Sequence, residues 1–320
     1  MPPALSIVLV AHEMQRELPR TLRSLDLPYQ RAIERDAYEV IVVDNGSAHP
    51  PDERTLAHFS GRLRATHVEA APQSPAMAAN RGLEMAQGEI VGLLIDGARI
   101  ASPGLLSGAL MGSRVAETPV VATLGWHLGP DTHMDAARSG YDRQAEDRML
   151  TEAGWEEDGY RLFALSSLSG SSRRGWFGPL GESNALFMHR RMWEQLGGLD
   201  TRFSLPGGGL VNHDLYSRAC ALPGAQLVVV LGEGPFHQIH DGASTSRRVS
   251  RETAFADYEA HRGHPYSPPR NPAIYVGGVP ATALEDLDYS VRWALRAGSS
   301  EAEPAMRGTS RRTRSSDHGT

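Results

Sequence analysis

The stretch EIVGLLIDGARI (residues 89–100) carries a run of aliphatic side chains that ends abruptly at Asp96. A short, continuous apolar run is typical of a strand that is buried on both faces. Further runs of this kind are SIVLV (6–10), EVIVV (39–43), PVVATLG (119–125) and QLVVVLG (226–232), and stretches with helical spacing separate most of them. Buried strands that alternate with helices predict an α/β fold, with a Rossmann-like, mostly parallel central sheet and helices on both faces.

Two carboxylates follow directly after predicted strands. Asp44 begins DNGS after the strand at 39–43, and Asp96 begins DGAR after the strand at 89–95. In an open parallel sheet, ligands bind beyond the carboxyl ends of the strands. We therefore expect Asp44 and Asp96 on one edge of the sheet, where a ligand would bind.

Composition restricts the class of protein. The 320 residues are 40% hydrophobic and 22% charged, which is ordinary for a globular protein. The formal net charge of −6 argues against a nucleic-acid partner. The single cysteine, Cys220, excludes an internal disulfide and a metal site built from cysteines. PPALSIVLV is too short to span a bilayer and lacks the basic flank of a signal peptide, so we expect a soluble, cytoplasmic protein without a transmembrane segment.

The pattern along the chain changes three times. Residues 1–125 alternate between strands and helices, whereas residues 126–181 scatter Trp among Gly, Ser and charged residues. Residues 182–296 return to regular patterning, and residues 297–320 are rich in Ser, Arg, Glu and Gly. We expect an irregular, loop-rich insert at 126–181 and a disordered tail at 297–320.

Four segments, taken in order, resemble glycosyltransferase family 2, whose members have the GT-A fold. They are SIVLVAHEMQRELPRTLRSL, YEVIVVDNGS, MAANRGLEMAQGEIVGLLIDGA, and FMHRRMWEQLGGLDTRF followed by HDLYSR, and they cover roughly residues 5–240. The resemblance implies transfer of a sugar from a nucleotide-sugar donor to a hydroxyl of a glycan or small-molecule acceptor, with inversion and a divalent metal, Mn²⁺ or Mg²⁺. It also implies that residues 1–125 form the nucleotide-sugar-binding half and residues 182–296 the acceptor-binding half of one GT-A domain.

The chain departs from the family pattern at two motifs. Asp96-Gly97-Ala98 stands where the family has Asp-x-Asp, so the second metal-binding carboxylate is missing. Asn212 stands where the family's acidic motif places its general-base Asp, and an amide cannot take a proton.

The resemblance gives a candidate metal site. Asp96 can supply one oxygen ligand, and His240 or His237 of FHQIH can supply a nitrogen ligand; we prefer His240. Arg99 could grip a phosphate bidentately in place of the absent carboxylate. The ordinary alternatives are a turn-capping role for Asp96 and histidines packed beside Phe236.

The resemblance also implies that further residues contact the nucleotide sugar. Asp44 would accept hydrogen bonds from the base or ribose, Glu13 could face the same ribose, and Arg81 could approach the base or diphosphate. Each has an ordinary alternative: an Asx turn for Asp44, a solvated loop acid for Glu13 and an exposed helical side chain for Arg81.

The acceptor side needs a general base within hydrogen-bond reach of the acceptor hydroxyl. Asp214 is the carboxylate that remains in the acidic motif, and we predict it as the base with His213 behind it; its alternative is to stabilise the dipole of its own helix. Glu182, in GESNALF, is a further candidate for the base and is predicted to bind the acceptor. Trp176 could stack on an acceptor sugar ring or hold its loop to the core.

These features predict a glycosyltransferase. The alternative is a catalytically inactive, GT-A-like protein that binds a nucleotide or a glycan, which Ala98 and Asn212 would permit. A third hypothesis is another nucleotide-sugar enzyme, such as a hydrolase or a nucleotidyltransferase. The nucleotidyltransferase would need a Gly-rich loop bearing Lys or Arg after the first strand, where this chain reads VAHEMQRE.

Overall fold

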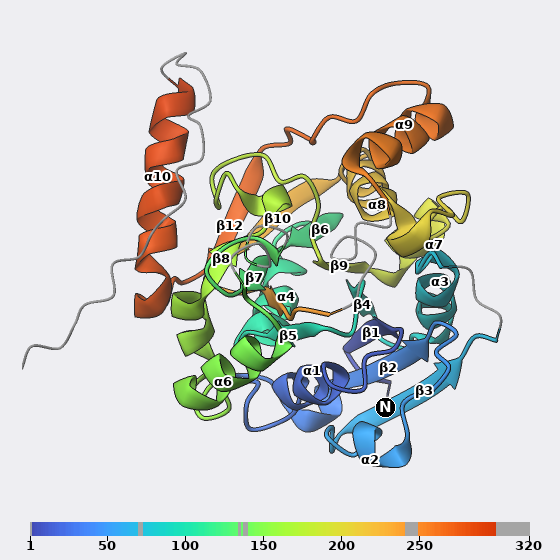
Figure 1. Ribbon diagram of the computed structural model, residues 1–320. Coiled ribbons are helices and arrows are strands. Elements are labelled where there is room, and N and C mark those ends of the chain that lie inside the picture. The colour runs from blue at the N-terminus through green and yellow to red at the C-terminus, as the bar shows by residue number, and fades with distance from the viewer. Residues whose placement is uncertain (1, 70–72, 134–135, 137–139, 241–248, 299–320) are drawn as a thin grey trace, which may run out of the picture.

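The computed structural model describes residues 2–69, 73–133, 136, 140–240 and 249–298 (Figure 1). The strands are β1 (Leu5–Ala11), β2 (Tyr38–Asp44), β3 (Arg62–His67), β4 (Ile90–Leu94), β5 (Arg99–Ala101), β6 (Pro119–Ala122), β7 (Trp126–Leu128), β8 (Ser166–Leu168), β9 (Ala185–His189), β10 (Gln226–Leu231), β11 (Pro235–His237) and β12 (Ala273–Gly277). The α-helices are α1 (Leu18–Leu25), α2 (Glu53–Leu56), α3 (Ala76–Met85), α4 (Leu105–Gly112), α6 (Arg143–Ala153), α7 (Arg190–Leu196), α8 (Val211–Cys220), α9 (Arg251–Arg262) and α10 (Leu284–Gly298).

The central sheet has eight strands in the order β12-β10-β6-β9-β4-β1-β2-β3. Strand β9 pairs antiparallel with β4 and β6, and the remaining neighbours in this sheet pair in parallel. Helices flank the sheet, and Figure 1 shows α10 at the side of the molecule opposite α3 and α7. The predicted α/β class with a mostly parallel central sheet is confirmed.

Successive residues of the central strands point into two separate cores. In β1, Val8 and Val10 belong to one core, whereas Ile7 and Leu9 belong to the other. Helices α3, α7 and α8 contribute buried side chains to the first core, and α1 and α4 contribute to the second. Because neighbouring side chains on a strand point to opposite faces, a sheet covered on both faces requires the continuous apolar runs seen in the sequence.

A second sheet, in the order β5-β11-β7-β8, continues from the carboxyl ends of central strands. Strand β5 follows β4 after a turn at residues 95–98, and β7 follows β6 after residues 123–125. The small sheet therefore lies where the ligand-binding edge was predicted.

Residues 126–181 are more regular than the predicted loop-rich insert, because they contain β7, α6 and β8. Helix α6 is capped at its N-terminus by Asp142, whose side chain accepts a hydrogen bond from the N–H of Ala145, and at its C-terminus by Gly154 in the left-handed conformation. Helix α10 extends to Gly298, so residues 297 and 298, which the sequence assigned to the tail, are helical. Residues 299–320 lie outside the described residues, and the tail stays a prediction there. Within the described part of the chain, no helix has the length and apolar character of a membrane span.

Candidate metal and nucleotide-sugar site

Two of the predicted carboxylates lie on the carboxyl edge of the central sheet. Strand β1 pairs with β2 so that Ala11 lies beside Asp44, and it pairs with β4 so that Leu9 lies beside Leu94, two residues before Asp96. The prediction that Asp44 and Asp96 share one edge is confirmed. A single strand, β1, separates them.

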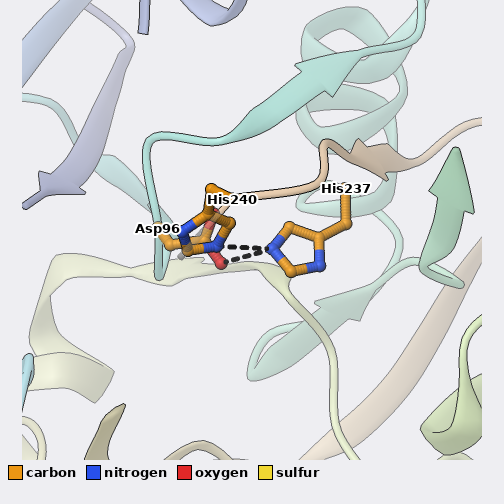
Figure 2. Close-up of side chains that lie close together, drawn as sticks. All are labelled: Asp96, His237 and His240. Atoms are coloured by element: carbon orange, nitrogen blue, oxygen red, sulfur yellow. Dashed lines mark hydrogen bonds and ion pairs between the residues drawn. The ribbon is translucent and has the colours of Figure 1, made fainter. Parts of the chain in front are cut away.

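Asp96, His237 and His240 form a group of potential metal ligands (Figure 2). The Nε2 atoms of the two histidines are 3.0 Å apart, and Nε2 of His237 is 3.4 Å from Oδ2 of Asp96. Ligand atoms that surround one cation at about 2.1 Å lie roughly 3–3.5 Å from one another. These two separations match that spacing, and all three ligand atoms lie within 4.8 Å of one another, so the group could hold a divalent cation. The structure thus brings together both histidines that the sequence left as alternatives.

The second sheet places His237 in this group. Strand β11 pairs antiparallel with β5, so that His237 lies opposite Arg99. Arg99 is 6% exposed, and its Nη2 atom is 3.0 Å from Oδ2 of Asp96. A guanidinium buried against Asp96 is poorly placed to grip a phosphate, so the predicted phosphate contact of Arg99 is corrected to a supporting one: it orients the Asp96 carboxylate.

Further imidazoles pack beside the ligand group. The rings of His127 and His133 have centroids 5.4 Å and 4.9 Å from that of His237. Burial lowers the pKa of His127 and His237 well below the ordinary value, and it lowers the pKa of His133 to about 4. A neutral imidazole keeps a lone pair for a metal, so the lowered pKa of His237 suits a ligand.

Sequence patterns did not identify His127 or His133. His127 is next to His237 only because β7 pairs with β11, and those strands are far apart in the chain. Three-residue strands such as WHL (126–128) carry too little periodicity to be recognised.

Asp44 and Glu13 shape the loops at this edge. Asp44 accepts hydrogen bonds from the N–H and the hydroxyl of Ser47, and its Oδ2 is 2.7 Å from Nδ1 of His67. Glu13 has φ +50°, and its side chain accepts the N–H of Ala48, a hydrogen bond that lowers the pKa of this carboxylate. The contacts of Asp44 support its Asx-turn alternative, whereas Glu13 is hydrogen-bonded to the loop and not merely solvated. Contact with the nucleotide stays a prediction for both residues.

Arg81 and Trp176 have contacts of an ordinary structural kind. The Arg81 side chain is 55% exposed on α3 and pairs with Glu84 at 3.2 Å, as surface ion pairs do. Trp176 is 1% exposed, and its ring centroid is 5.9 Å from that of Trp126. A buried ring has no face for an acceptor sugar, so Trp176 holds its loop to the core, as its alternative stated.

Asp214 is also corrected. It is 1% exposed; its Oδ2 accepts from Nε of Arg218 at 2.8 Å and its Oδ1 accepts from Nε of Arg262. Because both oxygens are engaged and shielded from solvent, neither can reach an acceptor hydroxyl. The contacts instead tie α8 to α9, which contradicts the prediction of Asp214 as the general base.

Glu182 lies in a polar cluster at the start of β9. Its Oε2 accepts a hydrogen bond from Nδ2 of Asn212 at 2.9 Å, and Nδ1 of His213 is 3.4 Å from the same oxygen. Asn212 also donates to Oδ1 of Asn184 at 3.1 Å. The first turn of α8 thus brings two predicted residues, Glu182 and His213, together.

A buried ion-pair network holds the backbone between His237 and His240. Glu146 of α6 is fully buried; its Oε2 accepts the N–H of Ile239 at 2.8 Å and its Oε1 accepts from Arg16 at 3.0 Å. Arg16 also donates to the carbonyl of Ile239 at 3.1 Å. The N–H and the carbonyl of Ile239 are therefore both hydrogen-bonded, and this fixes the backbone that carries His237 and His240.

Replacing Glu146 by Gln should remove part of the pH dependence of stability. Burial raises the pKa of Glu146 from 4.5 to about 7, although the neighbouring Arg16 lowers it. Because the native state binds this proton more tightly than the unfolded state, the free energy of unfolding falls as the pH rises through this window, by on the order of 1–3 kcal/mol. Urea unfolding between about pH 5 and pH 8 should show wild type losing stability relative to Glu146→Gln. A constant difference between the two proteins would contradict this assignment.

Comparison with known proteins finds similarity at the level of structure. No family model and no curated protein matches the chain. The solved structure of S. aureus TarS 1–349 in complex with UDP-GlcNAc aligns over 81% of this chain and 65% of that chain, with a TM-score of 0.50 and 13% identity. The mannosyltransferase PcManGT from Pyrobaculum calidifontis, in complex with GDP-Man and Mn²⁺, aligns over 95% of this chain and 77% of that chain, with a TM-score of 0.49 and 16% identity.

The chain is shorter than its first structural neighbours. The alignment spans 35% of a longer TarS chain and 65% of TarS 1–349. At such low identity a structural likeness shows the fold. The likeness to TarS 1–349 shows that this chain shares its fold, with a mostly parallel central sheet flanked by helices.

Proposed function

We propose that this protein is a glycosyltransferase, which moves a sugar from a nucleotide-sugar donor to an acceptor hydroxyl with a divalent cation held by Asp96, His237 and His240. One observation supports the proposal most: Asp96 follows β4 at the carboxyl edge of a GT-A-like sheet, and His237 and His240, at and after the end of β11, lie beside it. Ligands of such sheets bind at that edge. UDP-GlcNAc, which is bound to TarS 1–349, represents the proposed class of donor.

The ligand group suits Mn²⁺ better than Mg²⁺. Two imidazoles and one carboxylate match the preference of a first-row transition metal, whereas Mg²⁺ prefers oxygen ligands. When bound, such a cation would neutralise the charge that develops on the departing nucleoside diphosphate. Asp96 is oriented for this role, because its Oδ1 accepts the N–H of Ala98 at 3.0 Å while Arg99 contacts Oδ2. In this proposal a histidine nitrogen replaces the carboxylate that is missing at Ala98.

We also propose that the transfer inverts the anomeric carbon in one displacement. This chemistry needs a group that neutralises the leaving diphosphate and a base for the acceptor hydroxyl. The ligand group can serve the first need, and the polar cluster around Glu182 offers a carboxylate for the second. The acceptor is proposed to be a glycan or a small molecule.

Turnover of a nucleotide sugar tests this function. Purified protein should release nucleoside diphosphate from a UDP-, GDP- or dTDP-sugar in the presence of Mn²⁺, slowly with water as acceptor and faster with a suitable glycan. Removal of the metal with a chelator should abolish release, and added Mn²⁺ should restore it. Nucleotide binding without release from any donor would instead favour the inactive GT-A-like protein, and failure to bind any nucleotide would contradict both hypotheses.

A further inference from the structure

A displacement at this edge needs a carboxylate that can accept a proton. Five carboxylates lie at or near this edge: Glu13, Asp44, Asp96, Asp214 and Glu182. Asp44 is engaged by Ser47 and its neighbours, Asp96 belongs to the metal-ligand group, and Asp214 lies between two arginines. Both oxygens of Glu13 accept hydrogen bonds, from Ala48 and from Gln15. Of these five, Glu182 alone lies outside the ligand group and has a carboxylate oxygen that accepts no hydrogen bond from the residues that the structure describes.

The two oxygens of Glu182 differ in their contacts. Oε2 is held by the Asn212 amide at 2.9 Å, with the His213 ring at 3.4 Å, whereas Oε1 has no hydrogen-bond partner among the residues that the structure describes. The side chain is 16% exposed, so it is held by the protein and still reaches solvent. A carboxylate with one fixed and one free oxygen has a defined direction in which to accept a proton.

The strand register places Glu182 on the same edge as Asp96. Strand β9 runs antiparallel to β4, with Ala185 beside Leu94. The chain that enters β9 therefore runs alongside the chain that leaves β4, with Glu182 three residues before this pair and Asp96 two residues after it. Ser183 fixes the entering chain, because its Oγ accepts the N–H of Thr123 at 3.0 Å and donates to the carbonyl of Ala185 at 2.9 Å.

Asn212 explains how the carboxylate is held. Its amide donates to Glu182 and to Asn184 from the first turn of α8, and an amide cannot itself take a proton. We propose that Glu182 is the general base of the transfer and that Asn212 is its positioning residue; this inference rests on the proposed glycosyltransferase function. The acceptor hydroxyl gives its proton to Oε1 of Glu182 as its oxygen bonds to the anomeric carbon, and the bond from that carbon to the diphosphate oxygen breaks.

Three variants test this assignment. The activity measured is the release of nucleoside diphosphate from the preferred nucleotide sugar, with water as the acceptor. Glu182→Gln should lower kcat by about 10²–10⁴-fold, the usual contribution of a general base. Its nucleotide affinity should stay within about threefold of wild type, because the ligand group is intact. Glu182→Asp, which retains a carboxylate, should keep more activity than Glu182→Gln.

The third variant moves the carboxylate. In Glu182→Gln/Asn212→Asp, the new carboxylate lies next to the old one, so kcat should recover at least about tenfold over Glu182→Gln. Glu84→Gln, a change at an exposed glutamate of α3, is the matched control and should leave kcat unchanged.

The outcomes separate the two proposals. If wild type turns over donor and Glu182→Gln has a kcat within about threefold of it, the assignment of Glu182 is overturned and the glycosyltransferase function stands. Loss of nucleotide binding or of folding in Glu182→Gln, without recovery in the double variant, would assign Glu182 a structural role and also overturn it. A wild-type protein that binds no nucleotide sugar would remove the proposed function itself.

Discussion

Replacing Asp96 by Asn is expected to lower turnover of the nucleotide sugar by about 10²–10³-fold, the cost of removing one preorganised charge-stabilising group from an active site. Asn has nearly the same shape as Asp, but it is neutral and a weak metal ligand. Asp96 is the carboxylate of the ligand group, so the two histidines would have to hold the cation without an anionic ligand. The substitution also leaves the buried Arg99 without its partner.

The measurements for Asp96→Asn are kcat at saturating donor and the nucleotide affinity with and without Mn²⁺. Asp288→Asn is the matched control, because Asp288 is an exposed carboxylate on α10 that pairs with Arg292. The control should behave as wild type. An Asp96→Asn protein that retains wild-type turnover and metal dependence would show that Asp96 is merely a turn-capping residue.

Asp214→Asn is expected to destabilise the fold by about 3–5 kcal/mol, as removal of one partner from a buried ion pair does. The carboxylate accepts one hydrogen bond from Arg218 of α8 and another from Arg262 of α9, and both guanidiniums are largely shielded from water. Arg262 keeps its second partner, Asp200, at 2.8 Å, whereas Arg218 keeps contacts to backbone carbonyls alone. The loss should therefore fall on the junction of α8 and α9.

Urea unfolding of Asp214→Asn, beside the exposed control Asp288→Asn, measures this loss. The control should change the free energy of unfolding by no more than about 1 kcal/mol. At a temperature where Asp214→Asn is folded, its kcat should stay within about fivefold of wild type. A variant with wild-type stability and a kcat lowered by two orders of magnitude would restore Asp214 as the general base.

The central sheet could be predicted because each of its inner strands is buried on both faces. Val8 and Ile7 enter different cores, so the sequence runs of β1, β2, β4 and β10 are continuous and easily recognised. Strand β12 lies at the edge of the sheet and its residues are half-buried or exposed; its four-residue apolar run AIYV is too short to be recognised as a strand from the sequence. Helix α6 has a capping Asp142 and a terminal Gly154, but it buries only Glu146 and Leu150 and so lacks a clear apolar face.

The sequence predicted the location of candidate residues that directly follow a strand. It did not predict contacts between segments that are distant in the chain. Asp96 follows β4 directly, so its place on the edge could be anticipated. Arg99 is buried because β5 pairs with β11, and this pairing cannot be seen from the sequence. The sequence therefore left Arg99 as a candidate for contact with a phosphate. Asp214 was predicted to be the base because the sequence does not show its ion pair with Arg262, which lies 48 residues further along the chain. The contact of Glu182 with Asn212 likewise spans 30 residues. Neither contact has a local sequence pattern.

The central claim is that Asp96, His237 and His240 hold a metal that binds the donor diphosphate. The most direct test is to measure the affinity of wild-type protein for UDP, GDP and dTDP by titration, once with Mn²⁺ and once with a chelator. We expect one nucleotide to bind at least about tenfold more tightly with Mn²⁺ than with chelator. We expect Asp96→Asn to lose this difference. Equal affinity of wild type for that nucleotide with and without metal would contradict a metal site at the end of β4.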